Sequence, residues 1–273
     1  MIFSTAFQLR LQSFMGFTVA WILAPVYFLL IRLAGWRVRE VDETRKRWAA
    51  LLREHPGPWL VCGNHLTMID SMIMTYAMMS LGKHLSAYRS LPWNLPERTN
   101  FQRNRVMTIL CYLTKCIPVR RGGTREEMRG ALEKCDHLLR RRQNLMIFPE
   151  GGRSRTGRVN REDFSYGIGR FLQVHPDCRV MCVYLRGDGQ AGYGAMPRRG
   201  ESFTVMLEAF RPCRNGLQGL REQRDLAGQV VMHLAGMEDS YFDLHRQRHC
   251  GLEPFGKQGQ EPGPAFRFPC LHR

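Results

Sequence analysis

The chain is poor in acidic residues. Its 273 residues include 24 Asp and Glu against 40 Lys and Arg, which gives a formal net charge of +16. This excess indicates an anionic partner, such as nucleic acid, acidic lipid headgroups or a phosphorylated substrate. Most of the basic residues are arginine, whose guanidinium can bind a phosphate with two parallel hydrogen bonds.

Paired cysteine motifs are missing as well. The nine cysteines are odd in number and include no C-x-x-C pair, so the sequence indicates neither a zinc site nor a disulfide framework. Cys62, Cys111 and Cys182 lie in apolar runs and are predicted to be small core residues. A reducing, cytosol-facing domain is the simplest fit to this cysteine usage.

Two catalytic signatures are absent. There is no G-x-S-x-G nucleophile elbow, which disfavours a serine hydrolase. Gly152 and Gly157 have the glycine spacing of a P-loop, but Arg158-Val159 follows where the loop requires Lys-Ser or Lys-Thr, which disfavours a kinase. A non-catalytic basic module on a membrane or nucleic acid is the alternative class. However, no nucleic-acid-binding signature and no interleaved stacking aromatics are present.

Long uncharged runs are also scarce, with one exception. Leu11 to Ile31 carries no charge and is long enough to cross the ~30 Å hydrocarbon core of a bilayer as a helix. Pro25 would kink such a helix, so a re-entrant or interfacial hairpin is the alternative. A cleaved signal peptide is disfavoured, because Arg32 interrupts the end of the segment and no A-x-A site follows. A buried core helix seldom runs this long without a charge.

The basic residues around this segment are unevenly placed. Arg10 precedes it, whereas a basic cluster follows it: Arg32, Arg37, Arg39, Arg45, Lys46 and Arg47. The positive-inside rule therefore places the following domain on the cytoplasmic face of the inner membrane.

Beyond the N-terminal segment, apolar runs alternate with helical patterns. This alternation predicts a single α/β domain with a central, mostly parallel or mixed sheet flanked by helices. The expected boundaries are 1–37 for the membrane segment, 38–250 for the domain and 251–273 for a Pro/Gly-rich, poorly ordered tail. The predicted strands are 59–62, 85–89, 116–119, 144–148, 179–185 and 202–210. The predicted helices are 38–54, 71–81, 105–115, 124–142, 168–174 and 225–241, with loops at 91–96 and 187–200.

His65 and Asp70 stand at the turn between the first of these strands and its helix. Residues five apart do not share a helix face, so the two side chains can meet only if His65 lies in the turn and Asp70 in the first helical turn. A carboxylate there can accept the proton on one imidazole nitrogen and leave the other basic, as a general base requires. The alternative is a capping box, with Thr67 as N-cap and Asp70 at its third position.

A second block follows the predicted strand at 144–148. It reads Phe-Pro-Glu-Gly-Gly-Arg-Ser, residues 148–154, and between the two blocks lies Ile117-Pro118-Val119-Arg120-Arg121. In this order, Asn64-His65…Asp70, the Arg block and the Phe-Pro-Glu-Gly block resemble the glycerophospholipid acyltransferase family. The family includes the 1-acylglycerol-3-phosphate and glycerol-3-phosphate acyltransferases. The resemblance covers about residues 59–185.

The resemblance implies an O-acyltransferase of phospholipid biosynthesis. His65 would be the base and Asp70 its orienting partner, and the acceptor hydroxyl would attack a thioester directly, without a covalent acyl-enzyme. The implied substrate-binding residues are Arg120, Arg121, Glu150, Gly151, Gly152, Arg153 and Ser154. No metal or cofactor is implied, with acyl-CoA or acyl-carrier protein as co-substrate. Membrane lipid is the expected partner and nucleic acid is not; the sequence does not indicate an oligomeric state.

The choice of acceptor is less clearly indicated than the reaction. The run Gly-Gly-Arg-Ser-Arg-Thr-Gly at residues 151–157 and the pair Arg120-Arg121 resemble the glycerol-3-phosphate branch. Asn64-His65, the early membrane segment and the short chain resemble the lysophosphatidate branch. The family's fourth block usually carries a proline in an apolar strand, and residues 180–184 carry none. The expected acceptor is 1-acylglycerol-3-phosphate, with glycerol-3-phosphate or another lysolipid as the alternative.

Overall fold

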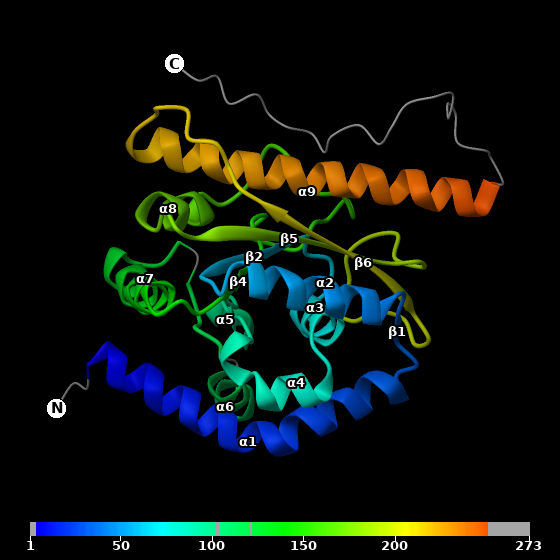
Figure 1. Cartoon of the computed structure of the whole chain (residues 1–273), viewed down its shortest axis with the longest axis horizontal. Helices are drawn as coiled ribbons and strands as arrows, with labels where there is room; N and C mark the ends of the chain where they lie inside the picture. Colours follow the sequence, from blue (N-terminus) through cyan, green and yellow to red (C-terminus); the bar gives the residue numbers. More distant parts are fainter. Residues whose placement is uncertain (1–3, 102–103, 121, 251–273) are drawn as a thin grey trace.

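The computed structural model describes residues 4–101, 104–120 and 122–250 (Figure 1). Arg121 and the predicted tail at 251–273 therefore lie outside the described residues. The helices are α1 (Thr5–Leu33), α2 (Val41–Glu54), α3 (Asp70–Met78), α4 (Leu81–Ser86), α5 (Arg98–Phe101), α6 (Arg105–Leu113), α7 (Arg125–Arg140), α8 (Gly167–Val174) and α9 (Gly219–Cys250), with a 3-10 turn at Tyr88–Ser90. The strands are β1 (Arg37–Val38), β2 (Trp59–Gly63), β3 (Trp93–Asn94), β4 (Leu145–Ile147), β5 (Arg179–Gly187) and β6 (Ser202–Phe210).

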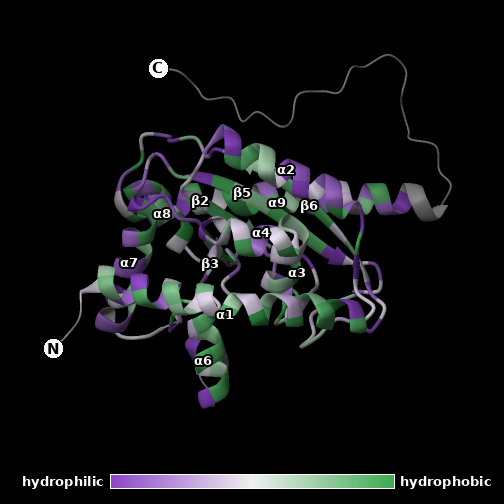
Figure 2. Cartoon of the chain, turned by 60° about the horizontal axis from the view of Figure 1, so that its bottom comes forward, coloured by the Kyte–Doolittle hydropathy of each residue, from purple (hydrophilic) through white to green (hydrophobic). Residues whose placement is uncertain are grey.

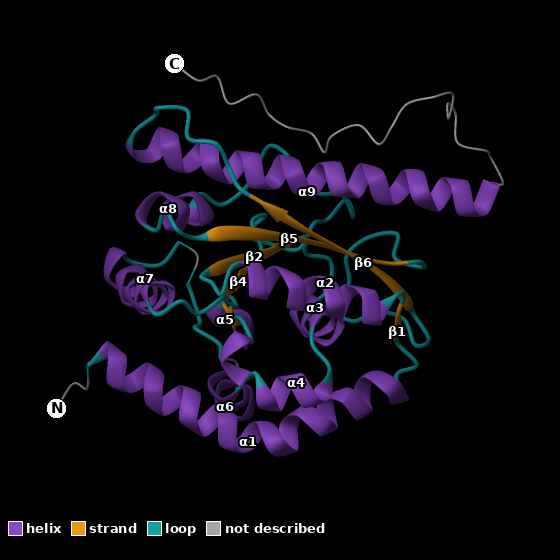
Figure 3. Cartoon of the chain, in the orientation of Figure 1, coloured by secondary structure: helices purple, strands orange, loops and turns teal. Residues whose placement is uncertain are grey.

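The strands form one six-stranded sheet in the order β1-β6-β5-β2-β4-β3 (Figure 3). Only the β5–β6 pair is antiparallel, and β2 runs parallel to both of its neighbours, β4 and β5. The prediction of a mixed α/β domain is confirmed. Because β2 and β4 are parallel and in register, the turns that follow them meet at the same edge of the sheet, where α/β folds place their sites.

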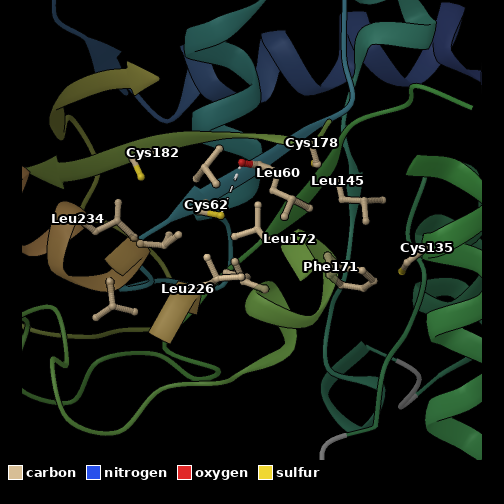
Figure 4. Packing of buried hydrophobic residues seen from close by; sticks show 14 of the residues in the cluster. Leu60, Cys62, Cys135, Leu145, Phe171, Leu172, Cys178, Cys182, Leu226 and Leu234 are labelled. Carbon is tan, nitrogen blue, oxygen red and sulfur yellow. Dashed lines mark hydrogen bonds between the residues drawn. The ribbon is translucent and has the colours of Figure 1, made fainter. Parts of the chain in front are cut away.

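Each face of the sheet carries its own hydrophobic core. Val61 and Met146 point toward α2 and α3, where they pack with Trp48, Ile73 and Met74. The opposite face packs against α7, α8 and α9 (Figure 4). Cys62 and Cys182 lie in this second core, and Cys111 is also buried, as the sequence predicted for small core residues. The seven cysteines whose side chains the structure describes, from Cys62 to Cys213, are free thiols.

Three predictions between the first two motifs are wrong. The strand expected at 85–89 is instead α4 followed by the 3-10 turn, because Ser80 caps a helix by accepting a hydrogen bond from the Lys83 N–H (3.4 Å). The loop expected at 91–96 contains β3. The strand expected at 116–119 makes only two isolated bridges, Asn94 to Cys116 and Glu97 to Val119. Strands of two residues are too short for apolar alternation to reveal them.

Helix α1 is continuous through Pro25 and lies along the outside of the domain, against α4, α6 and α7 (Figure 1). The Gln12 side chain donates to the backbone carbonyls of Tyr112 (2.9 Å) and Cys116 (3.0 Å). A Cβ on Gly16 would lie 2.4 Å from the Tyr88 hydroxyl, so only glycine permits this close approach. Among the described residues, α1 is the one helix that is both long enough and apolar enough to cross a membrane. Length and composition alone are weak evidence that it does so.

Candidate active site

The site begins where β2 ends. Gly63 is the last residue of the strand, and a Cβ there would lie 2.5 Å from the Met74 side chain and 3.4 Å from the Phe148 ring. The Asn64 side chain donates to the Leu185 carbonyl (2.9 Å) and accepts from the Leu185 N–H (2.7 Å). Since Asn64 is buried, these two hydrogen bonds hold the start of the turn against β5. The sequence marked Asn64 only as part of a motif and did not predict this role.

The turn brings His65 and Asp70 together, with 3.0 Å between His65 Nδ1 and Asp70 Oδ2. Asp70 Oδ2 also accepts from the backbone N–H groups of Leu66 (2.6 Å) and Thr67 (2.8 Å). The Thr67 hydroxyl donates to Asp70 Oδ1. The side chain of Asp70 is only 3% exposed, so all of these interactions form in a largely water-free environment.

The capping alternative describes part of this turn. Asp70 does reach back to the Thr67 N–H, which is half of a capping box. However, α3 begins at Asp70 with Ile69 at its N-cap, and the Thr67 hydroxyl bonds the carboxylate instead of a helix N–H. Asp70 therefore shapes the turn and binds the imidazole at the same time.

The imidazole ring lies flat on Phe148, with 4.2 Å between ring centroids and 20° between planes. An ionised carboxylate can only accept hydrogen bonds, so Nδ1 carries the proton and Nε2 has a free lone pair. Nε2 lies on the side of the ring away from Asp70. The His65 side chain is 18% exposed, which leaves it accessible to a substrate. A neutral imidazole held in one tautomer is the arrangement of a general base.

The second motif holds the backbone of His65. The His65 N–H donates to Glu150 Oε1 (3.1 Å), and the His65 carbonyl accepts from the Ser154 N–H (2.8 Å). Glu150 Oε2 accepts from the Asn160 N–H (3.3 Å). Burial raises the pKa of Glu150 to about 7, although the hydrogen bonds from the His65 and Asn160 N–H groups oppose the rise. Glu150 thus acts on the site through the position of His65.

A tight turn presents Glu150 to His65. The Gly151 N–H donates to the Phe148 carbonyl (3.0 Å), which closes a four-residue turn with Pro149 at its second position. Proline is favoured there and glycine at the fourth position. Gly151 has a φ of +67°, a value that residues with a side chain rarely adopt. Gly152 follows directly and leads the chain into Arg153.

Arg153 contacts a loop that the sequence did not connect with the site. Its guanidinium donates to the Gly194 carbonyl (2.8 Å) and lies 5.7 Å from the centre of the Tyr193 ring. The loop is also bonded to the turn that carries His65 and Asp70, because the Gly194 N–H donates to the Leu66 carbonyl (3.0 Å) and the Met68 N–H to the Ala195 carbonyl (3.1 Å). A glycine-rich composition was its only sequence signal.

The side chains of the other two described candidates, Ser154 and Arg120, do not bond the turn that carries His65 and Asp70. The Ser154 hydroxyl bonds within its own loop, to the Arg158 carbonyl and to Thr156 Oγ1 (3.2 Å). Arg120 comes directly after the segment 116–119, which forms bridges beside β3. Since β3 and β4 lie between this segment and β2, three strand spacings of ~4.8 Å, or roughly 14 Å, separate the Arg120 backbone from that of His65. Its guanidinium bonds Glu127 Oε1 (3.1 Å), which caps α7.

A second His–Asp pair lies on the other side of the sheet. His175 Nε2 is 3.0 Å from Asp136 Oδ1, the same separation as in the first pair. Arg170 binds both oxygens of Asp136, at 3.1 and 2.8 Å, so the pair joins α7 to α8 through an ion pair. In the described part of the chain, no group of three or more His, Cys, Asp or Glu side chains could hold a metal ion.

The comparison with known proteins covers the whole of this site. The model of the acyltransferase family matches residues 38–212, which is more than half of the chain and includes both motifs and the loop around Gly194. No curated protein matches the chain. The chain therefore belongs to the acyltransferase family, that of the glycerophospholipid acyltransferases.

Proposed function

We propose that this protein is a membrane-bound O-acyltransferase of phospholipid biosynthesis. It transfers a fatty acyl group from a thioester, acyl-CoA or acyl-carrier protein, to the hydroxyl of a lysophospholipid, with 1-acylglycerol-3-phosphate as the first candidate. The observation that carries the proposal is the 3.0 Å contact between His65 Nδ1 and Asp70, which leaves Nε2 as a base at a partly exposed position. The family match supports the acyltransferase class.

In the proposed reaction, the acceptor hydroxyl attacks the thioester carbonyl carbon while His65 Nε2 takes the hydroxyl proton. The tetrahedral oxyanion then collapses, the carbon–sulfur bond breaks, and the thiolate takes the proton from the imidazolium. Asp70 stabilises the imidazolium because its buried carboxylate carries the opposite charge. Glu150 and the Ser154 N–H keep the His65 backbone in position for both proton transfers.

Acceptor recognition is assigned to the arginines. Arg153 directly precedes Ser154, whose N–H donates to the His65 carbonyl, and it also contacts the loop around Gly194. Gly194 engages only one nitrogen of the guanidinium, so Arg153 has further N–H groups for a phosphate. Arg120 and Arg121 are the second group proposed, of which only Arg120 belongs to the described residues. Arg120 already forms an ion pair with Glu127, so the Glu127 carboxylate would compete with an acceptor phosphate for its guanidinium.

Localisation follows from the N-terminal segment. Helix α1 attaches the protein to the inner membrane, and the basic residues after it place the domain on the cytoplasmic face. High-salt washing removes proteins held by charge alone, so it is expected to leave the full-length chain on the membrane. Recovery of the intact protein in the wash would argue against an apolar anchor.

The test of the reaction is an acyl-transfer assay with the full-length protein in lipid nanodiscs. Each donor is combined with 1-acylglycerol-3-phosphate, other lysophospholipids and glycerol-3-phosphate, so the same panel identifies the acceptor. A general base contributes ~10²–10⁴-fold, and His65→Ala is expected to lose at least that much turnover while remaining folded. His175→Ala, which breaks the second His–Asp pair, is the matched control and is expected to keep its turnover per folded molecule. Near-wild-type turnover in His65→Ala would contradict the proposal.

A further inference from the structure

Helix α6 leaves its apolar side chains uncovered. Cys111 is its only buried residue, whereas Val106 and Ile109 are 67% and 57% exposed. Figure 1 shows α6 nearly end-on behind α1 and α4, and Figure 2 shows it lengthwise, projecting from the body of the domain. Exposing a helix of this composition to water is unfavourable, and a contiguous apolar surface of this kind marks an interaction site.

The apolar surface of α6 continues onto α1. The two helices are in contact, and Gln12 and Gly16 of α1 pack directly on the C-terminal end of α6. Most of the exposed large hydrophobic side chains in the described part of the chain lie on these two helices: Phe7, Leu11, Phe14, Met15, Phe17, Trp21, Ile22, Val26, Leu29, Leu30 and Leu33 on α1, and Val106, Ile109, Leu110 and Tyr112 on α6. We call these residues the apolar face.

The inner side of α1 packs against the domain along its whole length. Leu9 and Ile31, near its two ends, are both 3% exposed, and Phe28 packs on His84 of α4 (ring centroids 5.0 Å apart). The Tyr27 hydroxyl donates to the Met72 carbonyl of α3 (2.6 Å). If α1 left the domain to cross a bilayer, the carbonyls bound by Gln12 would lose their partner and the inner apolar side chains would be uncovered.

We propose that α6 is a second membrane-binding element, and that α1 and α6 lie together in one leaflet, both parallel to the bilayer plane. The inference rests on the proposed membrane location of the enzyme. A lipid surface is the occupant that fits, because the apolar face includes α1, the one helix in the described part of the chain that is long and apolar enough for a membrane. Its ends also carry exposed arginines, Arg10 and Arg32 on α1 and Arg105 on α6, whose charges suit anionic headgroups at the edge of the leaflet.

Depth measurement by spin labelling tests the proposal. Single cysteines replace the exposed Leu11, Ile22 and Leu30 on α1, Val106 or Ile109 on α6, and Leu220 on α9 as the control at the opposite end of the molecule (Figure 1). The background carries Cys213→Ser, Cys250→Ser and Cys270→Ser, because the other six cysteines are buried. The full-length protein is placed in vesicles of phosphatidylcholine and phosphatidylglycerol, and collisions with oxygen and with a water-soluble nickel complex report the depth of each label.

The proposal predicts that the α6 labels collide mainly with oxygen, as the α1 labels do, and that the Leu220 label collides mainly with nickel. The three α1 labels are expected at similar depths that show no steady change along the helix, apart from the small differences set by their positions around the helix axis. In a helix that crosses the bilayer, Leu11 and Leu30 would differ in depth by up to roughly 28 Å, since each residue adds ~1.5 Å. Nickel-accessible α6 labels, or graded depths along α1, would overturn the inference.

The same samples separate this inference from the proposed function. Acyl transfer by a labelled protein whose α6 is exposed to water would overturn the role of α6 and leave the enzyme assignment intact. Conversely, labels at the predicted depths in a protein that transfers no acyl group to any acceptor would support the membrane geometry and contradict the proposed reaction. The labelled positions lie outside the catalytic turn, so their substitution is expected to leave turnover unchanged.

Discussion

Replacing Asp70 by Asn separates the proposed catalytic role of the carboxylate from its role in the fold. The side chain keeps its size, and its one carbonyl oxygen can still accept from His65 Nδ1 and from the Leu66 and Thr67 N–H groups that Oδ2 now binds. The new amide N–H then faces the Thr67 hydroxyl, which can rotate and accept. What the variant loses is the negative charge beside the imidazole.

The magnitudes follow from these contacts. Asp70→Ala would leave two buried N–H groups without a partner, at ~1–3 kcal/mol each, which is a large part of a total stability of ~5–15 kcal/mol. Asp70→Asn keeps those bonds in weaker, neutral form and is expected to cost about 1–2 kcal/mol. Turnover is expected to fall by ~10²–10⁴, because the imidazolium formed during transfer loses its counter-charge or is held in the wrong tautomer.

The assay compares kcat, KM and the unfolding midpoint for wild type, Asp70→Asn and Asp70→Ala. The expected pattern is a folded Asn variant with very low kcat and nearly unchanged KM, beside a strongly destabilised Ala variant. If Asp70→Asn keeps kcat within severalfold of wild type, the carboxylate is only a turn-forming residue and His65 does not depend on it for catalysis. A matching loss of stability in both variants would also refute the reasoning.

Two further predictions concern the second motif. Arg153→Lys keeps the charge but loses the planar guanidinium, so the KM for the acceptor is expected to rise about ten- to a hundredfold while the KM for the donor stays nearly unchanged. Arg155→Lys and Arg158→Lys on the same loop are the controls. Equal small effects at all three positions would indicate a diffuse basic surface. The pKa of Glu150 is raised to about 7 by burial, so between its ordinary value of 4.5 and pH 7 the folded protein holds a proton that the unfolded chain releases. Stability contributed by Glu150 is therefore lost as pH rises through this window. The unfolding midpoints of wild type and Glu150→Gln are compared from pH 5 to 8. The midpoint of wild type is expected to fall relative to that of the variant as pH rises, and a constant difference would contradict the raised pKa.

The sequence alone determined the local part of the site. His65 and Asp70 are five residues apart on a strand, a turn and the start of a helix, so the apolar pattern around them was enough to predict that they meet. The same holds for the mixed α/β architecture, since buried strands and amphipathic helices each carry their own period. The uncharged run from Leu11 to Ile31 likewise predicted one long apolar helix, which α1 confirms.

Tertiary structure decided how these pieces are held together. Glu150 binds the His65 N–H across 85 residues of chain, and Asn64 binds Leu185 across 121. The loop around Gly194 is bonded both to the turn that carries His65 and Asp70 and to Arg153. None of these contacts produces a periodic pattern in the sequence, because each consists of one or a few hydrogen bonds between segments that become neighbours only when the sheet forms. The position of α1 along the domain and the exposure of α6 depend in the same way on packing between distant segments, and local sequence carries no record of it.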